Sequence, residues 1–163
     1  MIKAFVSDFS RVLLLPQDDS YTEGLNALHK KLSAGGDYDF WSYFRLNQDL
    51  LDFYKTIAKH IDMYMFTTEY IQEHPALQSK LSGIFKKVFS GARVGLKKIE
   101  VQSYYSIAKE IGLKPEEILY IDDKQANLDA AKEAGMVVIR YEANDQTKKD
   151  ITKALKNFSP QNE

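Results

Sequence analysis

The chain has 163 residues, with 22 Lys and Arg against 23 Asp and Glu, and its formal net charge at pH 7 is −1. This length suffices for one domain with its own core, and the near-neutral charge lacks the basic excess of a nucleic-acid binder. Without cysteine, a signal segment or a long apolar run, neither disulfides nor a membrane span is expected, and we predict a cytoplasmic protein.

Short segments rich in branched and aromatic apolar residues predict five β-strands. They lie at residues 2–7, 62–67, 87–90, 118–121 and 137–140. The segments between them have helical patterns with recognisable ends. The first predicted helix, 20–33, begins at a Ser20–Glu23 capping box and is closed by Gly35. A second helix is capped by Asn47, and a third is Pro75–Leu81. The last two are 99–111, which ends before Gly112, and 125–134, which ends before Gly135. Residues 157–163 are predicted to be a frayed tail.

Buried strands that alternate with helices indicate an α/β fold: a doubly wound, Rossmann-like, mostly parallel sheet with flanking helices. In such sheets ligands bind beyond the carboxyl ends of the strands. The residues that follow each predicted strand are therefore the candidates for a functional site.

Polar residues follow four of the five strands. Asp8 follows the first strand, Thr67 and Thr68 end the second, Lys97 and Lys98 follow the third after a short loop, and Asp122 and Asp123 follow the fourth, with Asn127 opening the next helix. Each feature alone has an ordinary structural explanation as a turn residue, a helix cap or a solvated side chain. Three carboxylates at one sheet edge, however, repel one another unless a cation is present, and oxygen ligands suit Mg²⁺. With a hydroxyl and a lysine beside them, they point to phosphoryl transfer.

The same residues resemble the four motifs of the haloacid dehalogenase-like hydrolases. The matching stretches are, in order, Asp8-Phe-Ser-Arg-Val-Leu13, MFTT ending at Thr67-Thr68, Gly95-Leu-Lys-Lys98, and ILYIDDKQANLDAAKEAGM at 118–136. The fourth stretch is the most specific. The resemblance covers about residues 2 to 140 except for a segment near 16–46, where helical-cap members of the family carry a longer insertion.

The resemblance implies a single domain over 1–163 and a Mg²⁺-dependent phosphohydrolase that forms an aspartyl-phosphate. Asp8 would be the nucleophile, and Thr67, Thr68 and Lys98 would bind the phosphoryl group. Mg²⁺ would be held by Asp8, Asp122, Asp123 and the backbone carbonyl of Ser10. The substrate would be a small or macromolecular phosphate ester, and the protein could form a homo-oligomer.

The sequence departs from the family pattern at Ser10, where most phosphatases of the family carry a second aspartate that serves as acid and base. A serine hydroxyl cannot exchange protons as a carboxylate does, and losing that help typically costs about 10²–10⁴-fold in rate. Arg11 replaces the usual glycine. These departures leave open an alternative function as a non-catalytic protein that binds phosphate, metal or another protein.

Residues 16–46 form the second departure and predict a much-reduced cap. The segment ends in the aromatic stretch YDFWSYF at 38–44. We expect these aromatic residues to pack on the protein's own core; an overhang of the site or a subunit contact are the alternatives. His29, His60 and His74 show no metal-ligand spacing and are predicted to be ordinary surface or partly buried residues.

Two further functions fit the sequence less well. Receiver domains use a similar set of residues on a similar sheet, but there the acidic pair comes first in the chain. Dehalogenation at carbon needs no metal and would leave Asp122 and Asp123 without a role.

Overall fold

The computed structural model of the chain describes residues 1–155, and the tail predicted at 157–163 lies outside this range. Its centre is a parallel five-stranded sheet in the order β5-β4-β1-β6-β7. The strands are β1 (Ala4–Ser7), β4 (Asp62–Thr67), β5 (Lys87–Ser90), β6 (Ile118–Asp122) and β7 (Val137–Arg140). All five predicted strands are present, and the predicted α/β class is confirmed.

The strand order also decides between two related folds. Numbered along the chain, the five parallel strands follow the order 3-2-1-4-5, whereas receiver domains follow 2-1-3-4-5. The order reverses between β1 and β6. At such a switch point the loops after the two neighbouring strands run in opposite directions and leave a crevice where ligands bind. In this chain the loop after β1 begins with Asp8, and the loop after β6 begins with Asp123.

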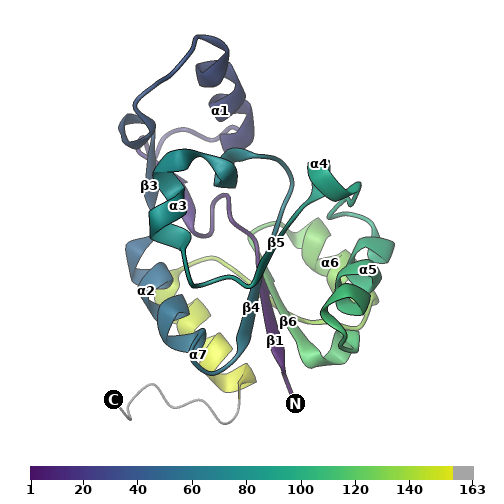
Figure 1. Cartoon of the computed structure of the whole chain (residues 1–163). Helices are drawn as coiled ribbons and strands as arrows, with labels where there is room; N and C mark the ends of the chain where they lie inside the picture. Colours follow the sequence, from purple (N-terminus) through teal and green to yellow (C-terminus); the bar gives the residue numbers. More distant parts are fainter. Residues whose placement is uncertain (156–163) are drawn as a thin grey trace.

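Helices cover both faces of the sheet (Figure 1). One face is covered by α2 (Gln48–Ile57), α3 (Pro75–Leu81) and α7 (Asn144–Ala154), and the other by α5 (Val101–Ile111) and α6 (Gln125–Glu133). Shorter segments are α4 (Gly91–Val94) and the 3₁₀ turns η1 (Phe40–Ser42), η2 (Ile71–Glu73) and η3 (Pro115–Glu117). The α7 helix has few apolar residues, and its sequence pattern did not predict it.

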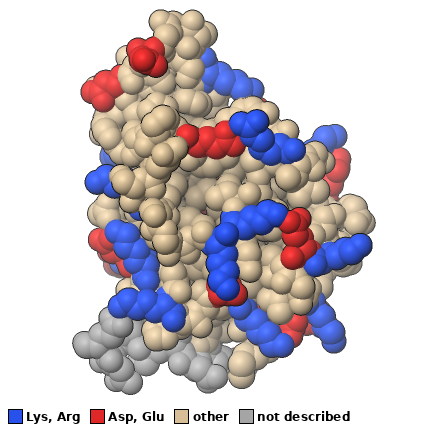
Figure 2. Space-filling view, viewed as in Figure 1, with Lys and Arg blue, Asp and Glu red and all other residues tan. Residues whose placement is uncertain are grey.

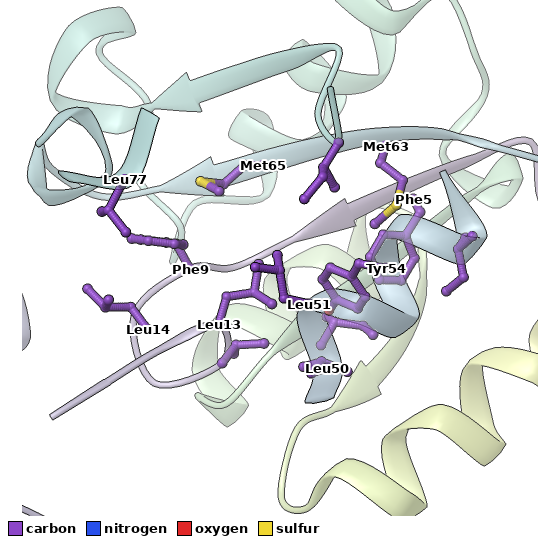
Figure 3. Close-up of a cluster of buried hydrophobic side chains, with 14 of the residues drawn as sticks. Phe5, Phe9, Leu13, Leu14, Leu50, Leu51, Tyr54, Met63, Met65 and Leu77 are labelled. Carbon is purple, nitrogen blue, oxygen red and sulfur yellow. The ribbon is translucent and has the colours of Figure 1, made fainter. Parts of the chain in front are cut away.

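The two cores follow from the two-residue period of the strands. Phe5, Met63 and Met65 point to the α2 face, where they belong to the same core cluster as the α2 residues Leu50, Leu51 and Tyr54 (Figure 3). Ala4, Val6, Phe66 and Tyr120 point to the α5 face. Asp8 follows Ala4 and Val6 at the same two-residue spacing. Its carboxylate is therefore expected to lie on the α5 side of the sheet, where its interaction partners are.

Several predicted helix ends are confirmed. The Asn47 side chain accepts a hydrogen bond from Leu50 N at the start of α2, and α3 begins at Pro75. Gly112 ends α5 with a φ of 80°, in the left-handed region that glycine adopts without strain.

Residues 16–46, here called the cap-like insertion, enter and leave the core through a two-stranded antiparallel ribbon of β2 (Leu14–Pro16) and β3 (Phe44–Leu46). Its helix α1 (Leu25–Ala34) lies at the end of the molecule opposite the N-terminus (Figure 1). The predicted capping box at Ser20–Glu23 was wrong. Ser20 donates instead to Asp18 Oδ1, from its backbone N at 2.9 Å and from its hydroxyl at 2.6 Å, and this local turn delays the helix until Gly24 becomes its N-cap.

Basic and acidic side chains are interspersed over the face shown in Figure 2, as the balanced composition leads one to expect. Among residues 1–155, no helix combines the length and the apolar character that crossing a membrane requires.

Candidate active site

Four charged residues meet at the carboxyl end of the sheet. Asp8 follows β1, Asp122 and Asp123 end and follow β6, and Lys98 lies in the loop between α4 and α5. Asp8, Asp122 and Lys98 are almost fully buried. One carboxylate oxygen from each of Asp8, Asp122 and Asp123 lies within 4.8 Å of the others. The sequence therefore identified a real cluster, and Lys98 rather than Lys97 belongs to it.

Lys98 bridges two of the carboxylates. Its Nζ donates to Asp8 Oδ1 and, at 3.0 Å, to Asp122 Oδ2. Burial disfavours the ammonium, but the two carboxylates outweigh it and raise the Lys98 pKa. Burial, with the charges of Asp122 and Asp123, raises the pKa of Asp8 to about 7 in spite of Lys98. One lysine thus does not neutralise three carboxylates at this edge.

The two residues of the acidic pair have different surroundings. Asp122 Oδ2 accepts from Lys98 Nζ, from the Tyr120 hydroxyl at 2.5 Å and from Asn127 Nδ2 at 3.0 Å, while Oδ1 accepts from Lys124 N at 2.8 Å. Burial opposes the charge, yet Lys98 and these donors hold the pKa of Asp122 below its usual value. Asp122 is a carboxylate whose partners lie within the protein.

Asp123 is different because its buried Oδ1 has no hydrogen-bond partner. Burial and the neighbouring Asp122 raise the Asp123 pKa. A buried carboxylate oxygen without a donor is costly, and a divalent cation among oxygen ligands would satisfy it. The cluster therefore fits Mg²⁺, with Asp123 as the residue most in need of it.

Two buried tyrosines support the cluster, one at Lys98 and one at Asp122, and were not found by sequence reasoning. The Tyr104 hydroxyl on α5 donates to Lys98 O at 2.7 Å, and the Tyr120 hydroxyl on β6 donates to Asp122 Oδ2 at 2.5 Å. Their rings meet edge to face at 5.1 Å. In the sequence both residues read as ordinary apolar positions of a helix and a strand, so only the fold reveals this contact.

The loop 8–14, here called the Asp8 loop, is a tight turn. Leu13 N and Leu14 N both donate to Phe9 O, and Arg11 N donates to Leu14 O at 2.7 Å. The Ser10 hydroxyl oxygen is buried and has no hydrogen-bond partner. The Ser10 hydroxyl, two residues after Asp8, is therefore not committed to another protein group.

The two threonines of the second motif are not equivalent. Thr67 is 1% exposed, and its hydroxyl donates to Gln72 Oε1 at 3.3 Å on η2. Thr68 is exposed, and its carbonyl accepts from Ala92 N at 2.9 Å. Gln72 is a further residue that sequence reasoning missed, because its contact with Thr67 depends on the η2 turn.

Gly91, at the start of α4, explains how the segment that carries Lys98 comes close to the second motif. A Cβ on Gly91 would lie 2.4 Å from Leu96 O and 3.3 Å from Thr68 O. These are backbone atoms, so any side chain at Gly91 would displace the path that leads to Lys98.

The cap-like insertion contacts the segment that follows β4. Lys30 on α1 pairs with Glu69 at 2.8 Å, and a cavity of about 270 Å³ lies beside them, lined by Asn26, His29, Lys30, Ser33, Ala34, Glu69 and Tyr70. Because Glu69 directly follows Thr68, this cavity borders the motif that contains both threonines.

Two of the three histidines lie together, and both are partly buried, as the sequence predicted. His29 Nδ1 lies 2.7 Å from the Tyr38 hydroxyl, and the rings of His29 and His74 meet at 5.8 Å. His74 also stacks on Phe40 at 4.4 Å. The aromatic stretch 38–44 thus packs largely on the protein's own residues, as expected.

Comparison with known proteins identifies the family of this chain. The family described as haloacid dehalogenase-like hydrolase matches residues 18–135. The chain belongs to the haloacid dehalogenase-like hydrolases. The matched range contains the second and third motifs and all but the last residue of the fourth, whereas Asp8 lies before it.

Among curated proteins, the chain is similar to enolase-phosphatase E1 of Aquifex aeolicus, with 41% identity over 86 residues, and to that of Persephonella marina, with 38% over 87. Each match covers 50% of this chain, but only 38% and 37% of the respective relatives. The chain therefore matches well under half the length of these enzymes.

Solved structures share the fold over most of the chain. An uncharacterised protein from Corynebacterium glutamicum aligns with a TM-score of 0.67 at 16% identity and covers 98% of both chains. A family enzyme from Bacteroides thetaiotaomicron, solved with magnesium and inorganic phosphate, aligns with a TM-score of 0.64 at 14% identity, over 88% of this chain and 96% of that one.

Proposed function

We propose that this protein is a Mg²⁺-dependent phosphohydrolase whose nucleophile is Asp8. The observation that carries the proposal is the cluster of Asp8, Asp122 and Asp123, in which the buried Lys98 pairs with only two of the three carboxylates, Asp8 and Asp122. A site with this charge set is suited to a phosphoryl group bound together with a divalent cation.

Asp8, Asp123 and the backbone carbonyl of Ser10 would hold the metal. Asp122, which the resemblance also placed among the ligands, would contribute charge from beside it, because its two oxygens already accept four hydrogen bonds. Mg²⁺ bound there supplies positive charge that offsets the oxygens of the phosphoryl group. Lys98, whose Nζ donates to Asp8 and Asp122, would supply positive charge in the same way. The carboxylates of Asp8 and Asp122 fix its ammonium, so it needs no reorganisation when the substrate binds.

In the first half-reaction, an Asp8 carboxylate oxygen would form a bond to phosphorus while the bond to the leaving-group oxygen breaks. The electron pair leaves with that oxygen, and the product on the protein is an aspartyl-phosphate. In the second half-reaction, water would attack phosphorus while the bond between phosphorus and the Asp8 oxygen breaks. The products would be inorganic phosphate and the Asp8 carboxylate, and the proton of the water would pass to solvent. Thr67 and Thr68 would bind the phosphoryl oxygens. For the Thr67 hydroxyl to do so, its hydrogen bond to Gln72 Oε1 would have to break.

Ser10 favours one alternative: a non-catalytic protein that binds phosphate or metal through the same cluster. The Ser10 side chain offers no group that is basic at neutral pH, so neither proton transfer has an obvious protein partner at that position. For a phosphohydrolase, the same fact favours substrates with leaving groups that need no proton, such as aryl or acyl phosphates. The cavity beside Glu69 would take the remainder of such a substrate.

The deciding experiment is a panel of phosphate esters assayed with and without Mg²⁺. We expect Mg²⁺-dependent release of phosphate, faster from aryl than from alkyl esters, and its loss in Asp8→Asn. Asp129→Asn, which changes an exposed aspartate on α6, is the matched control and should keep wild-type activity. Equal activity in Asp8→Asn and the wild type would exclude the proposed nucleophile, and binding of Mg²⁺ or phosphate without turnover would favour the alternative.

A further inference from the structure

Arg11 has the most unusual backbone conformation in the Asp8 loop. Within residues 1–155 it is the only non-glycine residue with a positive φ, at 63°. This left-handed region favours glycine, because a Cβ crowds the neighbouring backbone there. Glycine would make the same turn without strain, so the side chain of Arg11 is what needs an explanation.

That side chain reaches the cap-like insertion. Nη2 of Arg11 donates to two backbone carbonyls, Tyr21 O at 2.9 Å and Glu23 O at 2.6 Å. Both carbonyls lie just before Gly24, the N-cap of α1. Arg11 therefore joins the loop that carries Asp8 and Ser10 to the segment from which α1 begins.

The base of the insertion is fixed to the same loop by different contacts. Asn47, directly after β3, donates from its backbone N to Leu13 O at 2.8 Å and from Nδ2 to Val12 O at 2.9 Å. The β2–β3 ribbon pairs the entering and the leaving chain. These bonds hold the ribbon, but they lie at the opposite end of the insertion from α1.

The helix α1 itself has two polar attachments to the segment after β4. Lys30 pairs with Glu69, although the Lys30 side chain is 59% exposed, and Asn26 Oδ1 accepts from Ile71 N at 3.4 Å. An exposed ion pair and a long hydrogen bond are weak restraints. Arg11 connects the start of α1 to the Asp8 loop, because its charged guanidinium donates hydrogen bonds to the backbone carbonyls of Tyr21 and Glu23. Hydrogen bonds from a charged donor are stronger than those between neutral groups.

We propose that Arg11 is a positioning residue that clasps the cap-like insertion to the Asp8 loop, so that α1 keeps one position beside the carboxyl end of the sheet. The strained backbone at Arg11 persists because the guanidinium makes these two bonds. The inference goes beyond the proposed function, since it concerns how the insertion is held and applies equally to a catalytic and a non-catalytic site.

Hydrogen exchange measured by mass spectrometry on the full chain tests this proposal. In Arg11→Gly, which keeps the turn and removes the clasp, we expect peptides covering 21–34 to exchange at least about tenfold faster, while α5 and α7 stay within about twofold of the wild type. Arg11→Ala, which keeps the backbone strain, should show the same increase. Arg45→Gln is the matched control, because Arg45 lies in the same insertion and pairs with Asp19 rather than with the Asp8 loop.

Three results would overturn the clasp. Wild-type exchange of 21–34 in Arg11→Gly would show that the guanidinium bonds do not hold α1. Faster exchange in Arg11→Ala but not in Arg11→Gly would assign the effect to backbone strain alone. Equal acceleration in 21–34, α5 and α7 would mean that Arg11 contributes only to global stability.

A kinetic readout then separates the clasp from the proposed function. With p-nitrophenyl phosphate and Mg²⁺, Arg11→Gly should raise KM about fivefold and keep kcat within about twofold, because the clasp orients the cap and not the reacting groups. A loss confined to kcat would contradict a positioning role through the cap. Absence of turnover in the wild type would contradict the proposed function, while the exchange result would still decide on the clasp.

Discussion

At the carboxyl edge of the sheet, buried charged groups are held by hydrogen bonds from specific atoms, whereas the aromatic stretch 38–44 of the cap-like insertion packs through ring contacts. Asp122 accepts four hydrogen bonds, from Lys98, Tyr120, Lys124 and Asn127. In the insertion, Phe40 lies 4.8 Å from the Phe44 ring and stacks on His74. Substitutions that change only a polar group should therefore affect metal binding and activity at the edge. In the insertion, substitutions that shorten a buried aromatic side chain should lower the stability of the fold.

The largest change in reaction rate is expected from substitution of Ser10, which stands where most phosphatases of the family carry an aspartate. Ser10→Asp would supply a proton donor for the leaving group and a base for water, and it should raise steady-state hydrolysis of alkyl phosphates by up to about 10²–10⁴-fold. At 1.36 kcal/mol per decade this is roughly 3–5 kcal/mol. In the wild type, an aryl phosphate should give a burst of about one equivalent of leaving group before slow turnover.

Rapid-quench and steady-state assays measure both quantities. Equal rates with alkyl and aryl phosphates, or no gain in a folded Ser10→Asp protein that binds Mg²⁺, would show that another group transfers the proton.

Truncation of Phe40 tests the other side of the comparison. Phe40 is 2% exposed, and Phe40→Ala should lower the free energy of unfolding by about 3–5 kcal/mol, as is usual for a buried phenylalanine. Tyr43→Ala, in the same stretch but 42% exposed, is the control and should change it far less.

Urea denaturation can follow the single tryptophan, Trp41, and far-ultraviolet circular dichroism in parallel. Coincident transitions are expected because Phe40 and Phe44 belong to the same core cluster as Phe5. A Trp41 transition well below the dichroism transition in the wild type would mean that the insertion unfolds separately.

A change of one atom at the edge should have a clear but smaller effect. Asp122→Asn keeps the shape of the side chain and removes the charge that pairs with Lys98, so we expect Mg²⁺ affinity and phosphatase activity to fall by about 10–100-fold. Asp123→Ala should abolish calorimetric Mg²⁺ binding, since it removes the oxygen that has no protein partner. Weaker loss in Asp123→Ala than in Asp122→Asn would reverse the roles assigned to the pair.

The smallest effect concerns pH. Burial and the neighbouring His74 lower the pKa of His29 in the folded protein, so the unfolded chain takes up the proton more readily. The corresponding stability is fully present above about pH 6.5, the ordinary histidine pKa, and is lost as the pH falls through the lower folded pKa. The stability difference between wild type and His29→Gln should thus be larger at pH 7.5 than at pH 5, and equal differences in urea denaturation would contradict this.

The sequence predicted the edge far better than the insertion. Asp8, Asp122 and Asp123 are placed by the strands before them, and those strands could be recognised from a few consecutive apolar residues. Lys98 was identified by its spacing from Gly95 in the family motif. Each of these assignments depends on neighbours within a few positions, which is the information that a sequence pattern contains.

The insertion could not be predicted in the same way. Ser20 has a local alternative in Asp18, so a correct-looking capping box did not start a helix. The strands β2 and β3 have three residues each, too few to show a period. His29, Tyr38 and His74 meet only because α1 packs on the segment after β4, and Tyr120 supports Asp122 from a position that reads as a core residue. Contacts between distant segments decide all of these cases.

The central position of β1 has a consequence for how the protein is made. Ala4 pairs on one side with Asp62 and on the other with Ile118. At a synthesis rate of roughly 5–20 residues per second, on the order of ten seconds separates the emergence of β1 from that of its second neighbour. During this interval the apolar segment Ala4–Ser7 has an open strand edge and is exposed to misassociation. Parallel pairing over such separations is also intrinsically slow. The aspartate next to this strand acquires its surroundings only when β6 is in place, so a ribosome-bound fragment that ends before β6 should carry Asp8 without the cluster around it.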